Sequence, residues 1–319
     1  MSRRLVWTPL SPAELSPTPA GLRVEQVDPG VTGPEAPTLA DIADVEFYVP
    51  AYDTPVDLAT VLPAMTSLRV LQTQTAGVDA VQRHRPEQVT LCNARGVHDA
   101  STAELAVTLL LASLRGIPDF VRAQDDARWA YAHRRALADH TVLLVGHGSI
   151  GVALELRLAP FECHLLRVAR TARRTSDGQQ VHGLDDLPAL LPQADAVVLL
   201  VPLTEDTRGL AGSDFLAAMR DQAVLVNVSR GPVVDTQALV RETTSGRLQA
   251  ALDVTDPEPL PPDHPLWHAP GVLISPHVGG ATTAMSPRLR ALLRDQLDRF
   301  AAGEQLANVV AGPLTQPLR

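Results

Sequence analysis

A short glycine-rich string in the middle of the chain constrains the fold more than any other feature. Gly146, Gly148 and Gly151 have the spacing G-x-G-x-x-G. The apolar run at residues 141–145 predicts a buried strand before them, and residues 149–158 predict a helix after them. In that context the glycines allow a tight turn and a close backbone approach to a pyrophosphate at the helix N-terminus. The string therefore predicts a dinucleotide site; a tight turn without a ligand is the alternative.

Strands and helices alternate along the rest of the chain as well. Strands are expected at residues 4–7, 22–27, 45–49, 69–73, 89–93, 141–145, 163–168, 196–201, 223–228, 250–254 and 272–275. Helices are expected at residues 56–65, 103–115, 118–128, 149–158, 184–191, 213–220, 236–245 and 287–302. Such alternation produces parallel sheets covered by helices on both faces. We therefore predict an α/β fold with two doubly wound parallel-sheet domains, one flavodoxin-like and one dinucleotide-binding, flanking a cleft.

Composition excludes several classes of protein. A chain of 319 residues with 45% hydrophobic content can bury a large core and is expected to form two domains. The net charge of −9 disfavours nucleic acid and anionic membranes as partners. No apolar run approaches the roughly 20 residues that span a bilayer, and no apolar leader is expected at the N-terminus. Cys92 and Cys163 lack C-x-x-C spacing, so we expect a cytoplasmic protein without disulfides or a metal site.

All 27 basic residues are arginine. The absence of lysine from the sequence excludes a Schiff-base lysine, a phosphate-loop lysine and a kinase lysine. Any anionic ligand must therefore be bound by arginine, by backbone N–H groups or by helix N-termini.

The strand after the glycine turn lacks the acid that usually follows it. An Asp or Glu about 20 residues beyond the turn binds the adenine ribose 2′-hydroxyl in NAD-binding proteins. Here the chain reads V-A-R-T-A-R-R-T, with Arg170, Arg173 and Arg174 in that place. Guanidinium groups bind phosphate oxygens in a forked geometry, so we predict a preference for NADP(H), with NAD(H) still accepted. A solvated basic loop is the alternative, and Arg170 is the best candidate by position.

Several strings in order resemble a known family. They are L-Q-T-Q-T-A-G-V-D (71–79), T-A-E-L-A-V (102–107), V-G-H-G-S-I-G (145–151), V-P-L-T-E-D-T-R-G-L (201–210), N-V-S-R-G-P-V-V-D (227–235), A-L-D-V-T-D-P-E-P-L-P (251–261), P-L-W (265–267) and S-P-H-V-G-G-A-T (275–282). Together they resemble the D-isomer-specific 2-hydroxyacid dehydrogenases, and within them the glyoxylate/hydroxypyruvate reductases. Residues 1–65 match least.

The resemblance implies a site for a 2-oxo acid. Arg230 would pair with the substrate carboxylate and polarise the neighbouring carbonyl, and it directly follows an apolar strand, at the end where such sheets bind ligands. The backbone N–H groups of Gly77 and Val78 would hold the same carboxylate. His277 would act as the general acid, with Glu258 hydrogen-bonded to its far nitrogen. A neighbouring carboxylate favours the imidazolium form and fixes the orientation of the ring.

The resemblance also implies cofactor contacts beyond the glycines. Asp253, at the end of a predicted strand, would bind the nicotinamide carboxamide; a structural hydrogen bond is the alternative. Further contacts carry over to Ser149, Ile150, Val201, Pro202, Thr207, Val228 and Ser229. Contacts to the substrate side chain would come from residues 49–54 and 282–288, with Tyr52 and Met285 as candidates.

The expected domain organisation follows from these assignments. A substrate domain takes residues 1–98 and is completed by residues 288–319, while a cofactor domain takes residues 99–287. The two crossings would act as hinges. The predicted helices within residues 103–128 are the expected surface of a homodimer.

These observations favour an oxidoreductase that reduces glyoxylate or hydroxypyruvate with NADPH. A formate dehydrogenase would have Gln-Pro near the histidine and no glutamate partner, unlike Ser275-Pro276-His277 with Glu258. A phosphoglycerate dehydrogenase often carries a further regulatory domain. An NAD(H)-sensing interaction protein of the same fold is a rival from a different class, and turnover with 2-oxo acids discriminates it.

Overall fold

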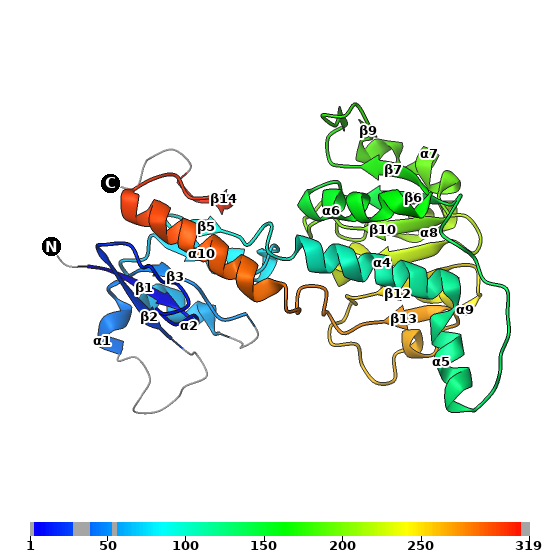
Figure 1. Cartoon of the computed structure of the whole chain (residues 1–319), viewed down its shortest axis with the longest axis horizontal. Coiled ribbons are helices and arrows are strands. Elements are labelled where there is room, and N and C mark those ends of the chain that lie inside the picture. The colour runs from blue at the N-terminus through cyan, green and yellow to red at the C-terminus, as the bar shows by residue number, and fades with distance from the viewer. Residues whose placement is uncertain (1–2, 28–38, 53–55, 314–319) are drawn as a thin grey trace. The chain divides into compact units, whose positions relative to one another are not determined.

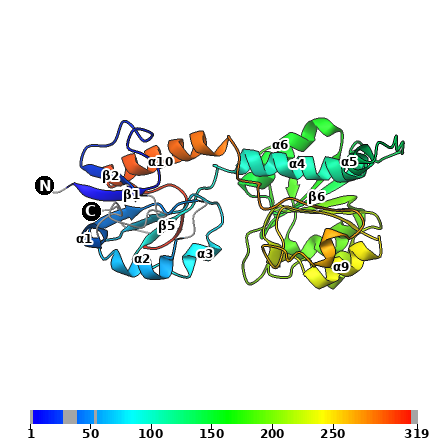
Figure 2. The same cartoon turned by 90° about the horizontal axis from the view of Figure 1, so that it is seen from below.

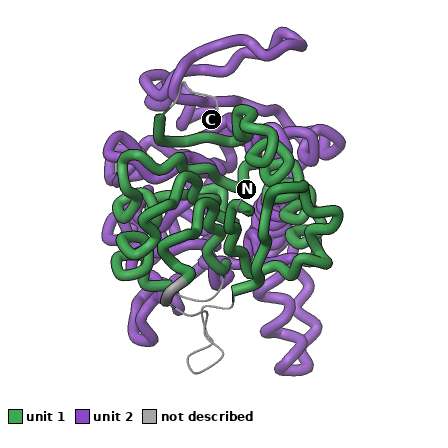
Figure 3. Tube along the Cα trace, turned by 90° about the vertical axis from the view of Figure 1, so that its left-hand side faces the viewer, with its two compact units in different colours: residues 1–98, 283–319 green, residues 99–282 purple. Residues whose placement is uncertain are grey.

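The computed structural model describes residues 3–27, 39–52 and 56–313. The chain divides into two compact units, which Figure 3 shows in different colours. Unit 1 consists of residues 1–98 and 283–319, and unit 2 of residues 99–282. The C-terminal helix α10 (Met285–Ala302) therefore lies wholly in unit 1, and the predicted boundary at 287/288 falls inside it. Proline is tolerated in the first turn of a helix, so the helix starts two residues before Pro287.

Unit 2 contains a sheet of six parallel strands. They are β6 (Thr141–Val145), β7 (His164–Val168), β10 (Ala196–Leu199), β11 (Val224–Asn227), β12 (Gln249–Leu252) and β13 (Val272–Ile274). Their order is β13-β12-β11-β10-β6-β7. The chain leaves β6 toward β7 and then returns to β10 on the other side of β6. This reversal is a topological switch point, where doubly wound sheets bind ligands outside the carboxyl ends of their strands.

Helices cover both faces of this sheet (Figure 2). They are α4 (Asp99–Arg115), α6 (Ser149–Leu158), α7 (Leu187–Leu190), α8 (Ser213–Ala218) and α9 (Thr236–Thr244). Helix α5 (Ile117–Asp125) follows α4 and contacts it. Alternate residues of each strand point to opposite faces. Leu143 and Val145 belong to the core cluster beneath α8 and α9, whereas Val142 and Leu144 belong to the one beneath α4 and α6. Burial on both faces explains why these strands are continuous apolar runs.

Helix α4 is buried along one side rather than all round. Ala103, Ala106 and Leu110 are fully buried, while Glu104 and Thr108 are exposed. Among the described residues, no single helix is both long enough and apolar enough to cross a bilayer. Within the described part of the chain, only α4 and α5 taken together have the length and apolar composition of a membrane span, and they are bent by 67°.

Unit 1 contains a second, similar sheet. Its parallel strands are β1 (Arg4–Thr8), β2 (Leu22–Gln26), β3 (Val45–Tyr48), β4 (Val70–Gln72) and β5 (Thr90–Cys92), and the edge strand β14 (Val309–Ala311) is antiparallel to β5. The order β14-β5-β4-β3-β1-β2 contains the flavodoxin-like progression 2-1-3-4-5. Its helices are α1 (Leu39–Ile42), α2 (Leu58–Ala64), α3 (Asp79–Gln82) and α10. The α/β prediction with two parallel sheets is confirmed.

Helix α10 completes the core of unit 1. Leu289, Leu293, Leu297 and Phe300 recur along one side of the helix and are buried, and the Phe300 ring packs edge-on against Phe47 at 5.2 Å between centroids. The helix ends at Gly303, whose φ of 71° lies in the left-handed region, as expected for a C-terminal cap. Figure 1 shows α10 and β14 beside strands from the other end of the chain.

Several short elements depart from the predicted pattern. The helix expected at 184–191 is instead α7 between two 3₁₀ turns, because Pro188 and Pro192 interrupt it. A hairpin of β8 (Arg173–Arg174) and β9 (Gln180–Val181) was not predicted. The 3₁₀ helices are Ala159–Phe161, Leu184–Asp186, Leu191–Gln193, Gly231–Val233 and Pro265–Trp267.

Candidate active site

The glycine turn lies at the switch point, between β6 and α6. Gly146 has a φ of +113°, and a Cβ there would meet the Leu200 carbonyl carbon at 2.7 Å. A Cβ on Gly151 would overlap the Gly146 carbonyl oxygen. At Gly148, by contrast, a Cβ would meet nothing within 4 Å. The turn is therefore packed tightly on its inner side and open at Gly148, which fits the approach of a dinucleotide pyrophosphate to the start of α6.

The open space at Gly148 and the close packing at Gly151 predict different effects for alanine substitutions at the two positions. Gly148→Ala should leave the melting temperature nearly unchanged but weaken NADPH binding, because its methyl group occupies the open side of the turn. Gly151→Ala should lower the free energy of unfolding by about 1–3 kcal/mol, because the added Cβ overlaps backbone. Thermal unfolding and calorimetric titration with NADPH measure the two effects. Wild-type NADPH affinity in Gly148→Ala, or wild-type melting of Gly151→Ala, would contradict this description of the turn.

Two residues at the start of α6 were predicted to contact cofactor. Ser149 is the first helical residue, and its hydroxyl donates to Asp99 Oδ1 at 3.2 Å. Ile150 follows it and is half-buried. Asp99 is the first residue of α4, so this contact joins the glycine turn to the point where the chain enters unit 2.

The loop after β10 lies on the same edge of the sheet. Val201 is buried, and Pro202 after it is exposed. The Thr207 hydroxyl donates to the Pro202 carbonyl at 2.6 Å and accepts from the Thr204 N–H at 2.8 Å. Thr207 thereby closes the loop that begins at Val201.

The loop after β11 holds Arg230 in a fixed backbone conformation. Asn227 Oδ1 accepts from the N–H of Ser229 at 3.0 Å and from its hydroxyl at 2.7 Å, and Asn227 Nδ2 donates to the Arg230 carbonyl at 3.0 Å. Arg230 Nη1 donates to the Ser229 carbonyl at 2.7 Å. A Cβ on Gly231 would overlap the carbonyl oxygen of Thr255. Val228 and Ser229 are buried beneath this loop, so Arg230 is half-buried at the carboxyl end of β11.

Asp253 organises the loop that carries His277. Its Oδ1 accepts from the Ser275 hydroxyl at 2.7 Å and from the Val278 N–H at 2.9 Å, and its Oδ2 accepts from the Gly279 N–H at 2.9 Å. The Asp253 carbonyl accepts from the His277 N–H at 2.8 Å. The structural alternative for Asp253 therefore has direct support, and its contact with the nicotinamide stays a prediction.

His277 and Glu258 are brought together from two different loops. His277 Nδ1 lies 2.5 Å from Glu258 Oε1, and their side chains are 46% and 40% exposed. The other ring nitrogen, Nε2, has no hydrogen-bond partner among the described residues. His277 also has a backbone φ of 53°, which is rare for residues other than glycine. Backbone strain of this kind clusters at functional sites. Because the His277–Glu258 pair is exposed, it contributes little to folding stability.

Arg230, Asp253 and His277 follow β11, β12 and β13, which are neighbouring parallel strands. The carboxyl ends of all three strands lie on one edge of the sheet, together with the glycine turn after β6. The structure therefore brings the predicted residues of unit 2 to a single edge. Among the described residues, no group of three or more histidine, cysteine or acidic side chains could hold a metal ion.

The remaining predicted substrate residues lie in unit 1. Gly77 and Val78 follow β4 and lead into α3, and the Gly77 carbonyl accepts from the Thr75 hydroxyl at 2.6 Å. The Tyr52 ring stacks on His98 at 5.6 Å between centroids, and Met285 packs against the core of the unit. Residues 53–54 of the predicted specificity segment lie outside the described residues.

The arginines beyond β7 differ in how they are held. Arg170 is exposed and has no hydrogen bond or ion pair to any described residue. Arg174 is also exposed, and its Nη1 donates to the Gly178 carbonyl within the hairpin at 2.9 Å. Arg173 reaches back to the glycine turn, where its Nη2 donates to the His147 carbonyl at 2.7 Å.

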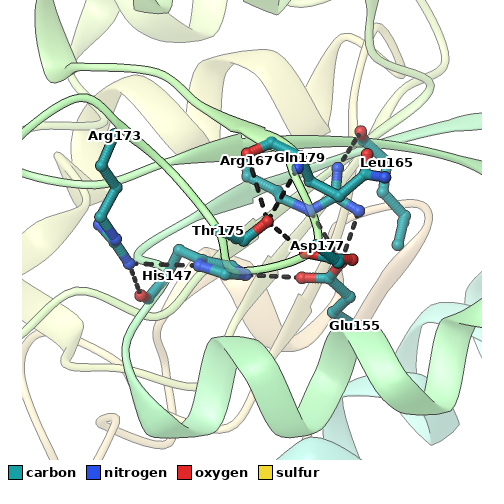
Figure 4. A network of polar contacts seen from close by, with 8 residues as sticks. All are labelled: His147, Glu155, Leu165, Arg167, Arg173, Thr175, Asp177 and Gln179. Carbon is teal, nitrogen blue, oxygen red and sulfur yellow. Dashed lines mark hydrogen bonds and ion pairs between the residues drawn. The ribbon is translucent and has the colours of Figure 1, made fainter.

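A polar network behind the turn was not predicted (Figure 4). His147 Nε2 lies 2.6 Å from Glu155 Oε2, and Arg167 donates to Glu155 Oε1 through Nε at 2.9 Å and Nη2 at 2.5 Å. The hydrogen bonds from Arg167 hold the pKa of the Glu155 carboxyl below its ordinary value, although partial burial opposes them. Glu155 lies on α6 and Arg167 on β7, so only the folded βα unit brings them to His147.

The geometry agrees with comparisons to known proteins. The sequence model of the D-isomer specific 2-hydroxyacid dehydrogenase NAD binding domain matches residues 107–279. Glyoxylate reductase/hydroxypyruvate reductase from Mus musculus is 34% identical over 252 residues, which cover 76% of this chain and 77% of the mouse protein.

Solved structures of similar proteins cover nearly the whole chain. A D-isomer specific 2-hydroxyacid dehydrogenase from Xanthobacter autotrophicus, in complex with NADPH and MES, is 30% identical with a TM-score of 0.79, covering 97% of this chain and 98% of that one. An NADPH-dependent glyoxylate/hydroxypyruvate reductase from Sinorhizobium meliloti, in complex with NADP and malonate, is 27% identical with a TM-score of 0.79, covering 99% of this chain and 98% of that one.

The fold, the glycine turn and the comparisons together show that the protein is an NAD(P)-dependent dehydrogenase. The chain belongs to the D-isomer specific 2-hydroxyacid dehydrogenase family, as its motifs implied. It is a dehydrogenase of D-2-hydroxy acids that binds a nicotinamide dinucleotide.

Proposed function

We propose that this enzyme reduces glyoxylate or hydroxypyruvate to the D-2-hydroxy acid, with NADPH as the preferred hydride donor. The observation that carries this proposal is the His277–Glu258 contact of 2.5 Å on the sheet edge that also presents Arg230. Unit 2 is assigned to the dinucleotide, and the backbone N–H groups of Gly77 and Val78 stay proposed contacts of the substrate carboxylate. The names of the mouse and Sinorhizobium relatives support the choice of substrate.

The cofactor, when bound, supplies a hydride to the C2 carbon of the 2-oxo acid. Gly146, Gly148 and Gly151 would hold its pyrophosphate, with the loops at 201–207 and 228–229 along the rest of the dinucleotide. Both carboxylate oxygens of Asp253 accept hydrogen bonds from the loop of His277, and Asp253 stays a proposed contact of the nicotinamide carboxamide.

His277 provides the proton that the reduced oxygen needs. Glu258 accepts from Nδ1, which leaves Nε2 as the nitrogen that faces substrate. The 2.5 Å contact also fixes the orientation of the ring, so Nε2 is positioned before substrate arrives. The two groups therefore act as a general acid and its orienting partner.

Arg230 binds the substrate carboxylate and draws electron density from the carbonyl. Its backbone is fixed by Asn227, so the guanidinium is positioned before substrate arrives. A preorganised cation beside the developing oxyanion stabilises the transition state more than the ground state.

The preference for NADPH rests on the arginines beyond β7. Arg170→Asp should lower the ratio of kcat/KM for NADPH to kcat/KM for NADH by about tenfold or more, because one phosphate contact is replaced by repulsion. Steady-state assays with both cofactors measure the ratio. An unchanged ratio in Arg170→Asp would remove Arg170 from the phosphate site.

Turnover tests the proposed function as a whole. Oxidation of NADPH and NADH should be measured with glyoxylate, hydroxypyruvate, pyruvate and phenylpyruvate. The first two acids with NADPH should have the highest kcat/KM. Binding of dinucleotide with no turnover of any of these acids would favour an NAD(H)-sensing interaction protein instead.

Assembly as a homodimer stays a prediction, as does a cytoplasmic location. Exposed apolar side chains on and after α5 support the dimer. They are Ile117 at 47%, Val121 at 52%, Trp129 at 96% and Tyr131 at 80% exposure.

A further inference from the structure

The imidazole of His147 lies between two opposite charges. On one side, Glu155 Oε2 is 2.6 Å from Nε2; on the other, Arg173 Nη2 is 3.3 Å from Nδ1. The side chain of His147 is only 2% exposed, so water does not replace either contact. Figure 4 shows the ring between the two partners.

The two contacts assign one donor and one acceptor role to the ring nitrogens. A carboxylate only accepts hydrogen bonds, so Nε2 is the N–H group that donates to Glu155. A guanidinium only donates, so Nδ1 presents its lone pair to Arg173. Arg167 saturates the other Glu155 oxygen with two N–H groups, which keeps the carboxylate charged and in place. His147 therefore links the Glu155–Arg167 ion pair to Arg173 through its two ring nitrogens.

Arg173 is the exposed cation of this network that has no direct acidic partner among the described residues. Arg167 offsets Glu155, whereas Arg173 makes no ion pair with any described residue. Only Nη2 of Arg173 is engaged, with the His147 carbonyl and ring, so its Nε and Nη1 groups remain available to a ligand. The hairpin of β8 and β9 is itself held on β7 by the Ala169 N–H, which donates to the His182 carbonyl at 2.9 Å.

We propose that His147 is a positioning residue for cofactor choice, which holds Arg173 beside the glycine turn to bind the 2′-phosphate of NADPH. This inference deepens the proposed NADPH preference and rests on it. It also ranks Arg173 above Arg170, because Arg173 is already anchored while Arg170 would have to be ordered by the ligand.

Two substitutions separate the two nitrogens of His147. Asn places an amide oxygen near the position of Nδ1 and can still accept from Arg173. Gln places an amide nitrogen near the position of Nε2, so it keeps the contact to Glu155 but loses the acceptor for Arg173. Binding of 2′,5′-ADP and of AMP, measured by calorimetry, reports on the phosphate contact without turnover.

The wild-type protein should bind 2′,5′-ADP at least about tenfold more tightly than AMP. His147→Gln should weaken 2′,5′-ADP binding about tenfold, the loss expected for one charge-assisted hydrogen bond, and leave AMP binding unchanged. His147→Asn should stay within about threefold of wild type. Arg173→Met should weaken 2′,5′-ADP binding about tenfold or more, and adding His147→Gln to it should cause no further loss.

Arg115→Gln is the control for net charge, because it removes an exposed arginine at the end of α4 in the same unit, away from the hairpin and the glycine turn. It should change 2′,5′-ADP binding less than about threefold. Equal effects of His147→Gln and His147→Asn, additive losses in the double variant, or an equal loss of AMP binding would overturn the proposal. So would wild-type protein that binds the two nucleotides alike. A protein that shows the expected binding but reduces no 2-oxo acid would refute the proposed reaction and leave this inference standing.

Discussion

His277→Asn should lower kcat for reduction of glyoxylate or hydroxypyruvate by about 10²–10⁴, the usual contribution of a general acid. Asn is the appropriate replacement because His277 has a φ of 53°, and Asn adopts that left-handed conformation more readily than other side chains. The side chain is 46% exposed, so the melting temperature should change little. Affinity for NADPH should also be preserved. Steady-state kinetics and thermal unfolding of the same preparation measure these effects.

Glu258→Gln tests the partner of the same proton donor. The amide is similar in size but replaces the carboxylate that accepts from Nδ1 and orients the ring, so kcat/KM should fall about 10–100-fold. Steady-state kinetics with hydroxypyruvate measure the loss. Asp298→Asn, which removes an exposed carboxylate on α10, is the control for net charge. Wild-type kcat/KM in Glu258→Gln, or an equal loss in Asp298→Asn, would contradict the assigned role of Glu258.

Arg230→Met should lower kcat/KM by about 10²–10⁴, because a forked charge-assisted contact to the substrate carboxylate is lost. KM should rise and kcat should fall, since the guanidinium both binds the acid and polarises its carbonyl. Arg230→Lys should restore little activity, because an ammonium cannot reproduce the planar fork. Steady-state kinetics with hydroxypyruvate measure both parameters.

Arg241→Met is the matched control for Arg230, because Arg241 is an arginine of α9 whose Nη2 donates to the Ser213 hydroxyl at 3.1 Å. It should leave kcat/KM unchanged. NADPH binding should persist in Arg230→Met. If that variant lost NADPH binding and activity in parallel, Arg230 would support the dinucleotide or the fold and not the acid.

The central strands of both sheets were predictable because most of them are short apolar runs. Strands such as Val224–Asn227 are buried on both faces, and such burial requires consecutive apolar side chains. The pairing of β14 with β5 was not predictable, because V-V-A at 309–311 becomes a strand only through contact with residues more than 200 positions away. The β8–β9 hairpin did carry a signal, since Asp177-Gly178 is a common hairpin turn.

The candidate site was likewise predictable from the sequence only in part. Motif order predicted roles for Arg230, Glu258 and His277, and the structure shows the contact between His277 and Glu258, while their roles stay predictions. The role of Asp253 in holding the His277 loop was left open, since carboxylates at strand ends serve both structure and binding. His147 and Glu155 were missed because one lies within the glycine turn and the other a full helix turn and more beyond it. An unusual histidine between two of the motif glycines was the available signal.

A crystal structure of the protein with NADP⁺ and oxamate, a stable mimic of a 2-oxo acid, tests the central claim most directly. The oxamate carboxylate should lie on the Arg230 guanidinium, with its amide-bearing carbonyl oxygen within hydrogen-bond distance of His277 Nε2. Glu258 should remain on Nδ1, and Arg173 should lie on the 2′-phosphate. Oxamate bound away from Arg230, or a His277 ring turned away from it, would contradict the account.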